Sequence, residues 1–156
     1  MVDIVDSATR SRMMSGIRSR NTKPELVLRK ALHALGFRYS LNQKDLPGKP
    51  DLVFRKYNAV IFVHGCFWHR HKNCKLASTP ATNPEFWQEK FIRNVERDKE
   101  HILTLQNIGW RTGIVWECSL RSSNVLPVIQ KVAHWLCSSR REIEYPDVHG
   151  TVNEPE

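Results

Sequence analysis

Residues 59–74 form the stretch Ala59-Val60-Ile61-Phe62-Val63-His64-Gly65-Cys66-Phe67-Trp68-His69-Arg70-His71-Lys72-Asn73-Cys74. Its first five residues are a continuous apolar run, which predicts a buried β-strand. The remainder carries three histidines, two cysteines and two adjacent large aromatic residues. Histidine and cysteine bind zinc, histidine transfers protons near neutral pH, and α/β proteins place such groups where strands end. The stretch therefore predicts a central strand of an α/β fold with a functional site at its end.

The neighbouring sequence predicts helices and further strands on both sides of this strand. The capping box Thr22-Lys23-Pro24-Glu25 begins the first helix. We expect helices over residues 23–35, 84–107 and 125–137 and strands over residues 37–41, 51–54, 59–63 and 110–116. The second and third strands form a hairpin, and the order of elements predicts a mixed sheet with helices on both faces.

The length of 156 residues fits a single folded domain, which we place over residues 21–139. We expect residues 1–20 to form a basic arm and residues 140–156 to form a polar, flexible tail. The sequence shows neither a membrane-length apolar run nor the pattern of a signal peptide. We therefore expect a cytoplasmic protein without membrane contact, whose four cysteines are reduced.

The formal net charge of +8 is concentrated in the N-terminal part of the chain and around the Cys/His stretch. Such a basic excess favours a polyanionic partner, and nucleic acid is the first candidate. The alternative is a basic surface that serves only solubility. Charge alone favours nucleic acid over that alternative.

Asp51 begins the first strand of the predicted hairpin, and the second strand ends at Phe62-Val63-His64. An acid on one arm and a backbone carbonyl on the other can share a hard cation such as Mg²⁺, which binds oxygen and keeps several waters. Such an ion polarises phosphoryl oxygens. Asp51 could instead only cap a strand or turn, but the nearby histidines 64 and 69 favour the functional interpretation.

A candidate four-ligand zinc site consists of Cys66, His71, Cys74 and Cys118. The first three lie within one short stretch, and Cys118 follows a predicted neighbouring strand. Four protein ligands close the coordination sphere, so such a zinc ion is structural. The alternative is a set of unrelated reduced thiols, which are often simply buried. We expect Cys137 to be a buried core residue of the last helix and not a zinc ligand.

His64 and His69 are left without a ligand role if zinc takes His71. Either could act as a general base, because the unperturbed imidazole pKa lies near neutral pH. A single histidine is more often structural, but two beside a candidate metal-binding acid favour catalysis. Glu25 is the acid of the capping box, and the residues alone favour that structural role.

Phe67, Trp68 and Trp87 are large aromatic residues among basic ones. Proteins that open DNA insert apolar side chains between base steps. Trp87 could equally be a core residue of its helix, whereas Phe67 and Trp68 lie between candidate ligands with little room to turn inward. We therefore expect Phe67 and Trp68 to face DNA.

Several motifs together resemble the very short patch repair (Vsr) endonuclease family. They are Leu46-Pro47-Gly48-Lys49-Pro50-Asp51, Val60-Ile61-Phe62-Val63-His64-Gly65-Cys66-Phe67-Trp68-His69, Glu85-Phe86-Trp87, Asn94-Val95-Glu96-Arg97-Asp98, Gly109-Trp110-Arg111 and Val115-Trp116-Glu117-Cys118. The resemblance covers roughly residues 7–137. It implies a restriction-endonuclease-like α/β fold over residues 21–139, from a divergent branch of the PD-(D/E)xK nucleases in which Phe62-Val63-His64 replaces the usual acid-x-Lys.

The resemblance also implies an activity. It is that of a Mg²⁺-dependent, strand-specific endonuclease that nicks double-stranded DNA 5′ to the thymine of a T·G mismatch, which arises by deamination of 5-methylcytosine. Further implications are a bacterial, nucleoid-associated monomer and mismatch-repair proteins as candidate partners. The alternative function is a non-catalytic, zinc-containing module that binds distorted duplex DNA, against which Asp51 argues.

The family's residue roles carry over by position. Asp51 and the Val63 carbonyl are implied to hold Mg²⁺, with His69 as the base and with Glu25 and His64 supporting the metal-bound waters and the phosphate. Other implied roles are structural Zn²⁺ binding by Cys66, His71, Cys74 and Cys118, intercalation beside the mismatch by Phe67, Trp68 and Trp87, and entry from the other groove by Met14 on the 1–20 arm. Two features depart from the familiar pattern: Val63 replaces a threonine, and residues 69–74 are less rich in histidine and one residue longer.

Overall fold

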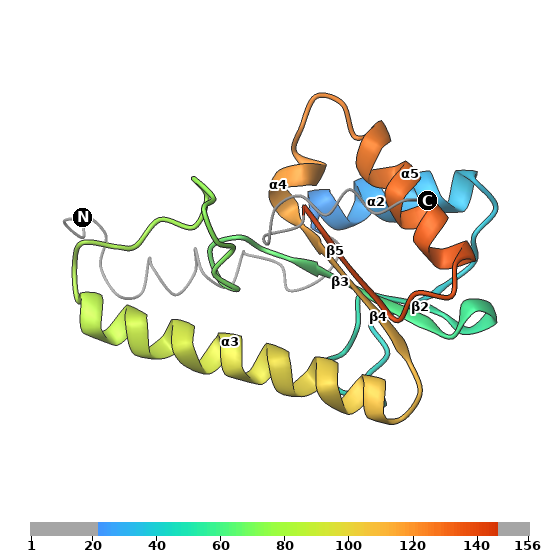
Figure 1. Cartoon of the computed structure of the whole chain (residues 1–156). Helices are drawn as coiled ribbons and strands as arrows, with labels where there is room; N and C mark the ends of the chain where they lie inside the picture. The colour runs from blue at the N-terminus through green and yellow to red at the C-terminus, as the bar shows by residue number, and fades with distance from the viewer. Residues whose placement is uncertain (1–21, 147–156) are drawn as a thin grey trace.

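The computed structural model describes residues 22–146. The predicted arm over residues 1–20, including Met14, and residues 147–156 of the predicted tail lie outside this range. A five-stranded mixed sheet forms the centre of the described part, in the order β1-β2-β3-β4-β5 (Figure 1). The strands are β1 (Ser40–Leu41), β2 (Leu52–Phe54), β3 (Ala59–His64), β4 (Arg111–Trp116) and β5 (Glu142–Tyr145). β1 to β3 pair antiparallel and β3 to β5 pair parallel, which confirms the predicted mixed sheet.

Helices cover both faces of this sheet, as predicted. Figure 1 shows the long helix α3 on one side and α2, α4 and α5 gathered on the other. The helices are α2 (Lys23–Ala34), α3 (Pro84–Asn107), α4 (Glu117–Leu120) and α5 (Leu126–Cys137), and a 3₁₀ turn, η1 (Arg55–Tyr57), joins β2 to β3. The single turn of α4, directly after β4, was not predicted. None of the helices in residues 22–146 combines the length and apolarity that a membrane span requires.

Local residues fix the ends of these helices. Thr22 Oγ1 accepts a hydrogen bond from the Glu25 N–H at 3.4 Å, which confirms the predicted cap of α2. α2 ends before Gly36, whose φ of 99° suits a residue without a side chain. α3 begins at Pro84 and ends before Gly109, with φ of 100°. Proline and glycine therefore mark the helix boundaries that the sequence predicts.

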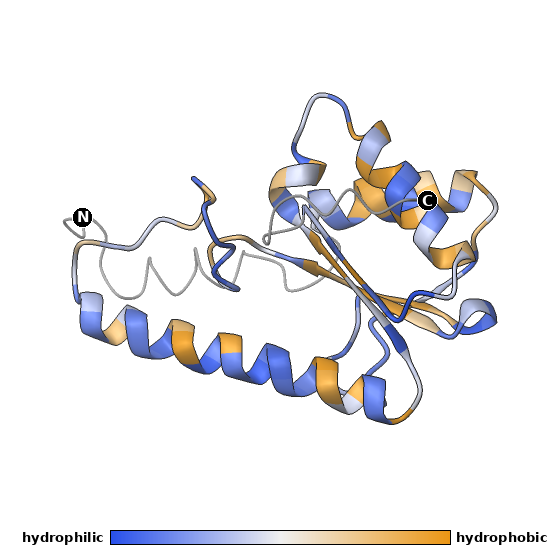
Figure 2. Ribbon diagram, in the orientation of Figure 1, coloured by the Kyte–Doolittle hydropathy of each residue, from blue (hydrophilic) through white to orange (hydrophobic). Residues whose placement is uncertain are grey.

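β3 is apolar on both faces because it lies in the middle of the sheet. Ala59 and Ile61 pack in the larger core formed with α2 and α5, whereas Val60 and Phe62 pack in a smaller core on the α3 side. α3 buries little: Phe91 and Leu105 are its buried residues, and Figure 2 shows most of this helix as hydrophilic. Much of α3 is therefore available to shape a site rather than a core.

The predicted strand over residues 37–41 is wrong for its first half. Only Ser40–Leu41 pairs with β2. Phe37 instead packs in the core below α2, with its ring 6.3 Å from that of Phe54. Cys137 was also misplaced, since it ends α5 on the exposed side rather than in the core.

The predicted flexible tail is wrong for Glu142–Tyr145, because these residues form β5 alongside β4. The sequence Glu142-Ile143-Glu144-Tyr145 alternates polar and apolar residues, which is typical of a half-buried edge strand. Ile143 and Tyr145 pack against the larger core. The strand therefore gains burial on one face although its composition is polar.

Candidate active site and metal centre

A cavity of about 560 Å³ opens where β3 ends, between the hairpin β2–β3 and helix α3. Three predicted catalytic residues, Asp51, His64 and His69, line it together with Val63. Asp98 of α3 also lines it, although no role was predicted for this residue. The cavity therefore unites residues from the hairpin, the loop after β3 and the long helix.

Asp51 immediately precedes β2, and its carboxylate lies against the end of β3. Its Oδ2 accepts a hydrogen bond from the Val63 N–H at 2.7 Å. Burial raises the pKa of Asp51 to about 7, the bond from Val63 acts to lower it, and the Glu25 carboxylate acts to raise it further. None of the ion pairs within residues 22–146 involves Asp51. A charged Asp51 therefore lacks a counterion in this part of the chain, and a hard cation fits beside it.

Glu25 belongs to the N-terminal cap of α2 and also lies close enough to Asp51 to affect its pKa. It lies in the first turn of α2, and only 1 % of its surface is exposed. Its Oε1 is 3.5 Å from Arg29 Nη1 on the next turn, and its charge reaches Asp51 strongly enough to raise the pKa of that acid. The capping position is thus compatible with a second role near Asp51.

His64 is the last residue of β3 and is 5 % exposed. Burial lowers its pKa to about 3, and the neighbouring His69 lowers it further, against the opposing effect of Asp98. The imidazole of His64 is therefore neutral at physiological pH. It stacks on the ring of His69 with centroids 4.0 Å apart and planes at 6°.

His69 is oriented by a carboxylate on α3. Its Nδ1 lies 2.5 Å from Asp98 Oδ2, so the Nδ1–H donates to the carboxylate and Nε2 is left for proton transfer. Asp98 belongs to a family motif recognised in the sequence, but on sequence alone it is one more acid on a charged helix. Its role depends on how α3 packs, which the sequence does not reveal.

The His64, His69 and Asp98 side chains could in principle hold a metal, since their ligand atoms lie within 4.8 Å of one another. Their geometry favours proton transfer instead. Imidazole lone pairs lie in the plane of the ring, so those of two stacked rings lie in separate, nearly parallel planes and do not meet at a common point. In addition, His69 Nδ1 is already bonded to Asp98.

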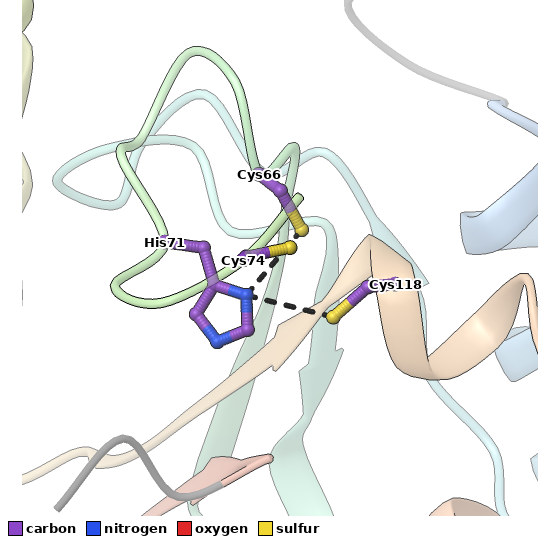
Figure 3. Close-up of side chains that lie close together, drawn as sticks. All are labelled: Cys66, His71, Cys74 and Cys118. Atoms are coloured by element: carbon purple, nitrogen blue, oxygen red, sulfur yellow. Dashed lines mark hydrogen bonds between the residues drawn. The ribbon is translucent and has the colours of Figure 1, made fainter. Parts of the chain in front are cut away.

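The four predicted zinc ligands converge on one point, as Figure 3 shows. Their ligand atoms lie within 4.8 Å of one another, and His71 Nδ1 is 3.6 Å from Cys66 Sγ and 3.5 Å from Cys118 Sγ. Cys66 follows β3 and Cys118 follows β4, and these parallel neighbours end at the same edge of the sheet. The structure thus brings together a Cys₃His set, which is a donor set suited to tetrahedral zinc.

The surroundings of this cluster also fit a metal. Burial raises the pKa of the Cys66 and Cys118 thiols, so both are protonated at neutral pH unless a cation displaces the protons. Residues 66–74, which we call the knuckle, turn through left-handed backbone at Arg70 and Asn73, both with φ of 56°. Glu117, which the sequence did not single out, accepts a hydrogen bond from the Cys66 N–H at 3.0 Å and fixes the start of the knuckle.

Arg70 ties the knuckle to the segment that follows it. Its guanidinium donates to the carbonyl oxygens of Ala77 at 2.9 Å and Ser78 at 3.0 Å, and to the Thr79 hydroxyl at 3.0 Å. It also lies 4.0 Å above the ring of Phe91. One of the basic residues counted toward a polyanion-binding surface is therefore a structural part of the loop.

Phe67, Trp68 and Trp87 form an aromatic cluster between the knuckle and α3. The Phe67 and Trp68 centroids are 5.0 Å apart, and each lies 5.9 Å from that of Trp87. All three side chains are half-buried, and Lys90 Nζ lies 5.4 Å from the Trp68 ring. The predicted residues are brought together and partly exposed, and their contact with DNA stays a prediction.

The model of the family described as DNA mismatch endonuclease Vsr matches residues 2–76. The chain is 42 % identical over 154 residues to the DNA mismatch endonuclease Vsr of Escherichia coli strain K12, which covers 96 % of this chain and 98 % of that protein. It is 44 % identical over 125 residues to the type II nicking enzyme V.NmeAIP of Neisseria meningitidis serogroup A, covering 80 % of this chain and 89 % of that enzyme.

A third relative is the type II nicking enzyme V.XorIIP of Xanthomonas oryzae pv. oryzae, 40 % identical over 126 residues. That alignment covers 81 % of this chain and 92 % of the enzyme. The chain belongs to the Vsr family of DNA mismatch endonucleases.

Proposed function

We propose that the chain nicks double-stranded DNA on the 5′ side of the thymine in a T·G mismatch, the product of 5-methylcytosine deamination, and so starts very short patch repair. The observation that carries the proposal is the pairing of Asp51 with a His69–Asp98 couple in one cavity. This cavity belongs to a chain 42 % identical to the Vsr mismatch endonuclease of E. coli. An acid that can hold a cation and an oriented histidine are the groups that phosphodiester hydrolysis requires.

Asp51 and the backbone carbonyl of Val63 would hold Mg²⁺, with Glu25 and His64 supporting the metal-bound waters and the phosphate. The buried Asp51 carboxylate, with a pKa near 7 and no counterion within residues 22–146, fits a hard divalent cation. When bound, Mg²⁺ would stabilise the negative charge that develops on the phosphoryl oxygens. Residues 62–64 would then take the place of the acid-x-Lys of restriction-endonuclease-like nucleases.

His69 would act on the attacking water. Asp98 holds the ring by its Nδ1–H, so Nε2 can take a proton while the water oxygen bonds to phosphorus and the phosphorus bond to the sugar oxygen breaks. His64 stacks on this ring and stays neutral, so it fixes the ring without adding a second positive charge.

The aromatic cluster would recognise the mismatch. Phe67, Trp68 and Trp87 lie together, and the first two directly precede His69 in the chain. Inserting aromatic rings costs unstacking energy that is lower at a mismatched pair than at a matched one. Met14 and the basic arm over residues 1–20 would hold the opposite groove. Cys66, His71, Cys74 and Cys118 would bind structural Zn²⁺, which shapes the loop that presents these aromatics.

A nicking assay on matched duplexes tests the proposal. Duplexes that differ only in a T·G or T·A pair are incubated with the purified chain, with and without Mg²⁺. We expect Mg²⁺-dependent cleavage of the thymine strand in the T·G duplex only, and none with Asp51→Asn although that variant still binds. Tight binding of T·G duplex by the wild type without cleavage would instead indicate the non-catalytic DNA-binding module. Varying the flanking bases then gives the sequence context.

A further inference from the structure

Trp116 contacts both His71 of the candidate metal centre and His64 of the catalytic cavity. It ends β4, is 6 % exposed, and pairs in the parallel register with His64 of β3. Its indole lies edge-on to the His64 ring, with centroids 5.3 Å apart and planes at 72°. The His71 ring lies nearly parallel to the same indole, with centroids 4.4 Å apart and planes at 12°. One buried indole therefore contacts both a candidate zinc ligand and a residue of the catalytic cavity.

The contacts continue from His64 to the proposed base. His64 stacks on His69, and His69 is bonded to Asp98. The rings of His71, Trp116, His64 and His69 therefore form one uninterrupted row. Because aromatic contacts have preferred geometries, each ring limits the positions open to the next.

Glu144 of β5 fixes the indole within this row. The Trp116 Nε1–H donates to Glu144 Oε2 at 3.0 Å. Flat and edge-on ring contacts alone leave an indole free to slide in its own plane, whereas a hydrogen bond from its only donor sets its orientation. The edge strand that the sequence did not predict thus supplies the anchor.

We propose that Trp116, held by Glu144, is a positioning residue that couples the order of the zinc-binding knuckle to the placement of His64 and His69. The inference rests on the proposed function, since nicking is the reaction that it affects. Residues that orient catalytic groups or metal ligands typically change activity or metal affinity about 10–100-fold when altered.

Four variants separate this role from ordinary packing. Trp116→Phe keeps a ring but loses the N–H, Glu144→Ala loses the acceptor, and Glu144→Gln keeps an acceptor carbonyl. Trp135→Phe is the matched control, because Trp135 is 1 % exposed and packs in the larger core. Its Nε1 has no hydrogen-bond partner among the residues that the structure describes. The control therefore removes a buried indole without removing such a bond or touching the row of rings.

Three quantities are measured for each variant: the single-turnover nicking rate at saturating T·G duplex, the duplex Kd without Mg²⁺, and the rate of zinc release to a chelator. We expect Trp116→Phe and Glu144→Ala to nick roughly tenfold more slowly or worse and to release zinc faster, with Kd within about twofold of wild type. Glu144→Gln should restore both rates. Trp135→Phe should nick at the wild-type rate even where it lowers Tm.

A change in only one of the two rates for Trp116→Phe would overturn the coupling, as would slower nicking that Trp135→Phe reproduces. A wild-type chain that does not nick T·G duplex would refute the proposed function instead. In that case zinc release still decides the structural half of the inference, because wild-type release from Trp116→Phe would show that the indole does not order the knuckle.

Discussion

The Asp51 carboxyl group titrates near neutral pH because it is buried, so protons and Mg²⁺ should compete for it under ordinary conditions. Its pKa is raised from 3.8 to about 7 in the folded chain. Without metal, the stability that the protonated form contributes is fully present below pH 3.8 and is lost as pH rises through about 7. A cation that neutralises the charged form would restore that stability at higher pH.

We therefore expect Mg²⁺ to raise Tm more at pH 8 than at pH 6, and its apparent affinity to weaken by up to about tenfold per pH unit below pH 7. Thermal unfolding across a Mg²⁺ series at several pH values measures both. Asp51→Asn is the control, since it removes the titrating charge and should show no such pH dependence. Equal Mg²⁺ effects in wild type at pH 6 and pH 8 would contradict the assignment.

Substitution of His69 or of Asp98 should each lower the nicking rate without unfolding the chain. We expect His69→Ala to lower single-turnover nicking by roughly a hundredfold or more, the usual scale for removing a general base. Asp98→Asn keeps the shape but removes the charge that holds the Nδ1–H, so a loss of roughly tenfold or more is expected. Single-turnover rates and circular dichroism check both. If His64→Ala is the more damaging change and His69→Ala is mild, the two histidines have exchanged roles.

Residues within one short stretch could be assigned from sequence more readily than partners between stretches. Asp51 and His69 were predicted as catalytic residues because each lies beside a strand end with other chemical groups nearby. Asp98 and Glu117 were not, because a carboxylate on a charged helix has no local feature that distinguishes it. Their roles arise from packing: α3 carries Asp98 to His69, and the end of β4 carries Glu117 to the Cys66 N–H.

At the scale of elements, four converging side chains join the knuckle to the helix α4 that follows β4. We expect one zinc per chain, and Cys66→Ser or Cys118→Ser should lose the metal and lower Tm, because a structural site contributes folding free energy. Cys137→Ser is the matched control, since Cys137 is exposed at the end of α5. Elemental analysis and thermal unfolding measure these effects. Freshly purified wild type without zinc would refute the site.

The aromatic cluster should discriminate between duplexes rather than bind all DNA equally. Trp68→Ala should weaken binding to T·G duplex by about 1–3 kcal/mol, the range for a lost base–aromatic stack. Its effect on fully paired duplex should be much smaller, because unstacking a matched step costs more. Affinity measurements with both duplexes decide it, and equal losses for Trp68→Ala would show that the ring only packs.

Elements with strong local boundaries were predictable, and elements that depend on a neighbour were not. α3 was placed correctly because Pro84 and Gly109 mark its ends. β5 was missed because Glu142-Ile143-Glu144-Tyr145 becomes a strand only when β4 offers an edge and the larger core receives Ile143. The strand that contains β1 was predicted to begin too early. Phe37 is apolar, which fits a strand or a core position equally well, and in the structure it packs in the larger core outside the sheet.

At the scale of the whole molecule, the uneven positive charge should control general DNA affinity. The arm over residues 1–20 carries Arg10, Arg12, Arg18 and Arg20, outside the described residues. Its deletion should weaken binding to matched and mismatched duplex alike and should flatten the dependence of Kd on salt, because fewer counterions are released. Affinities across a salt series measure this. An unchanged salt slope would show that the arm makes no phosphate contacts.

The mixed sheet and its two helical layers followed from the order of elements, and the meeting of Cys66 with Cys118 followed from adjacent parallel strands. The side of α3 that faces the sheet could not be predicted from the sequence, because the helix buries only Phe91 and Leu105. So weak an apolar pattern does not reveal which polar residues of the helix face the cavity. The place of Asp98 in the cavity was for that reason beyond prediction.

The convergence of Cys66 and Cys118 has a consequence for how fast the chain folds. β3 and β4 are parallel neighbours, so the whole segment with the knuckle and α3 must form a closed loop between them. Closing loops of this size makes parallel pairing slow. An ion gathering these cysteines early would act as a reversible cross-link, worth about 4 kcal/mol for such a loop in the chain-entropy model. Zinc availability during synthesis would then govern the yield of native chain.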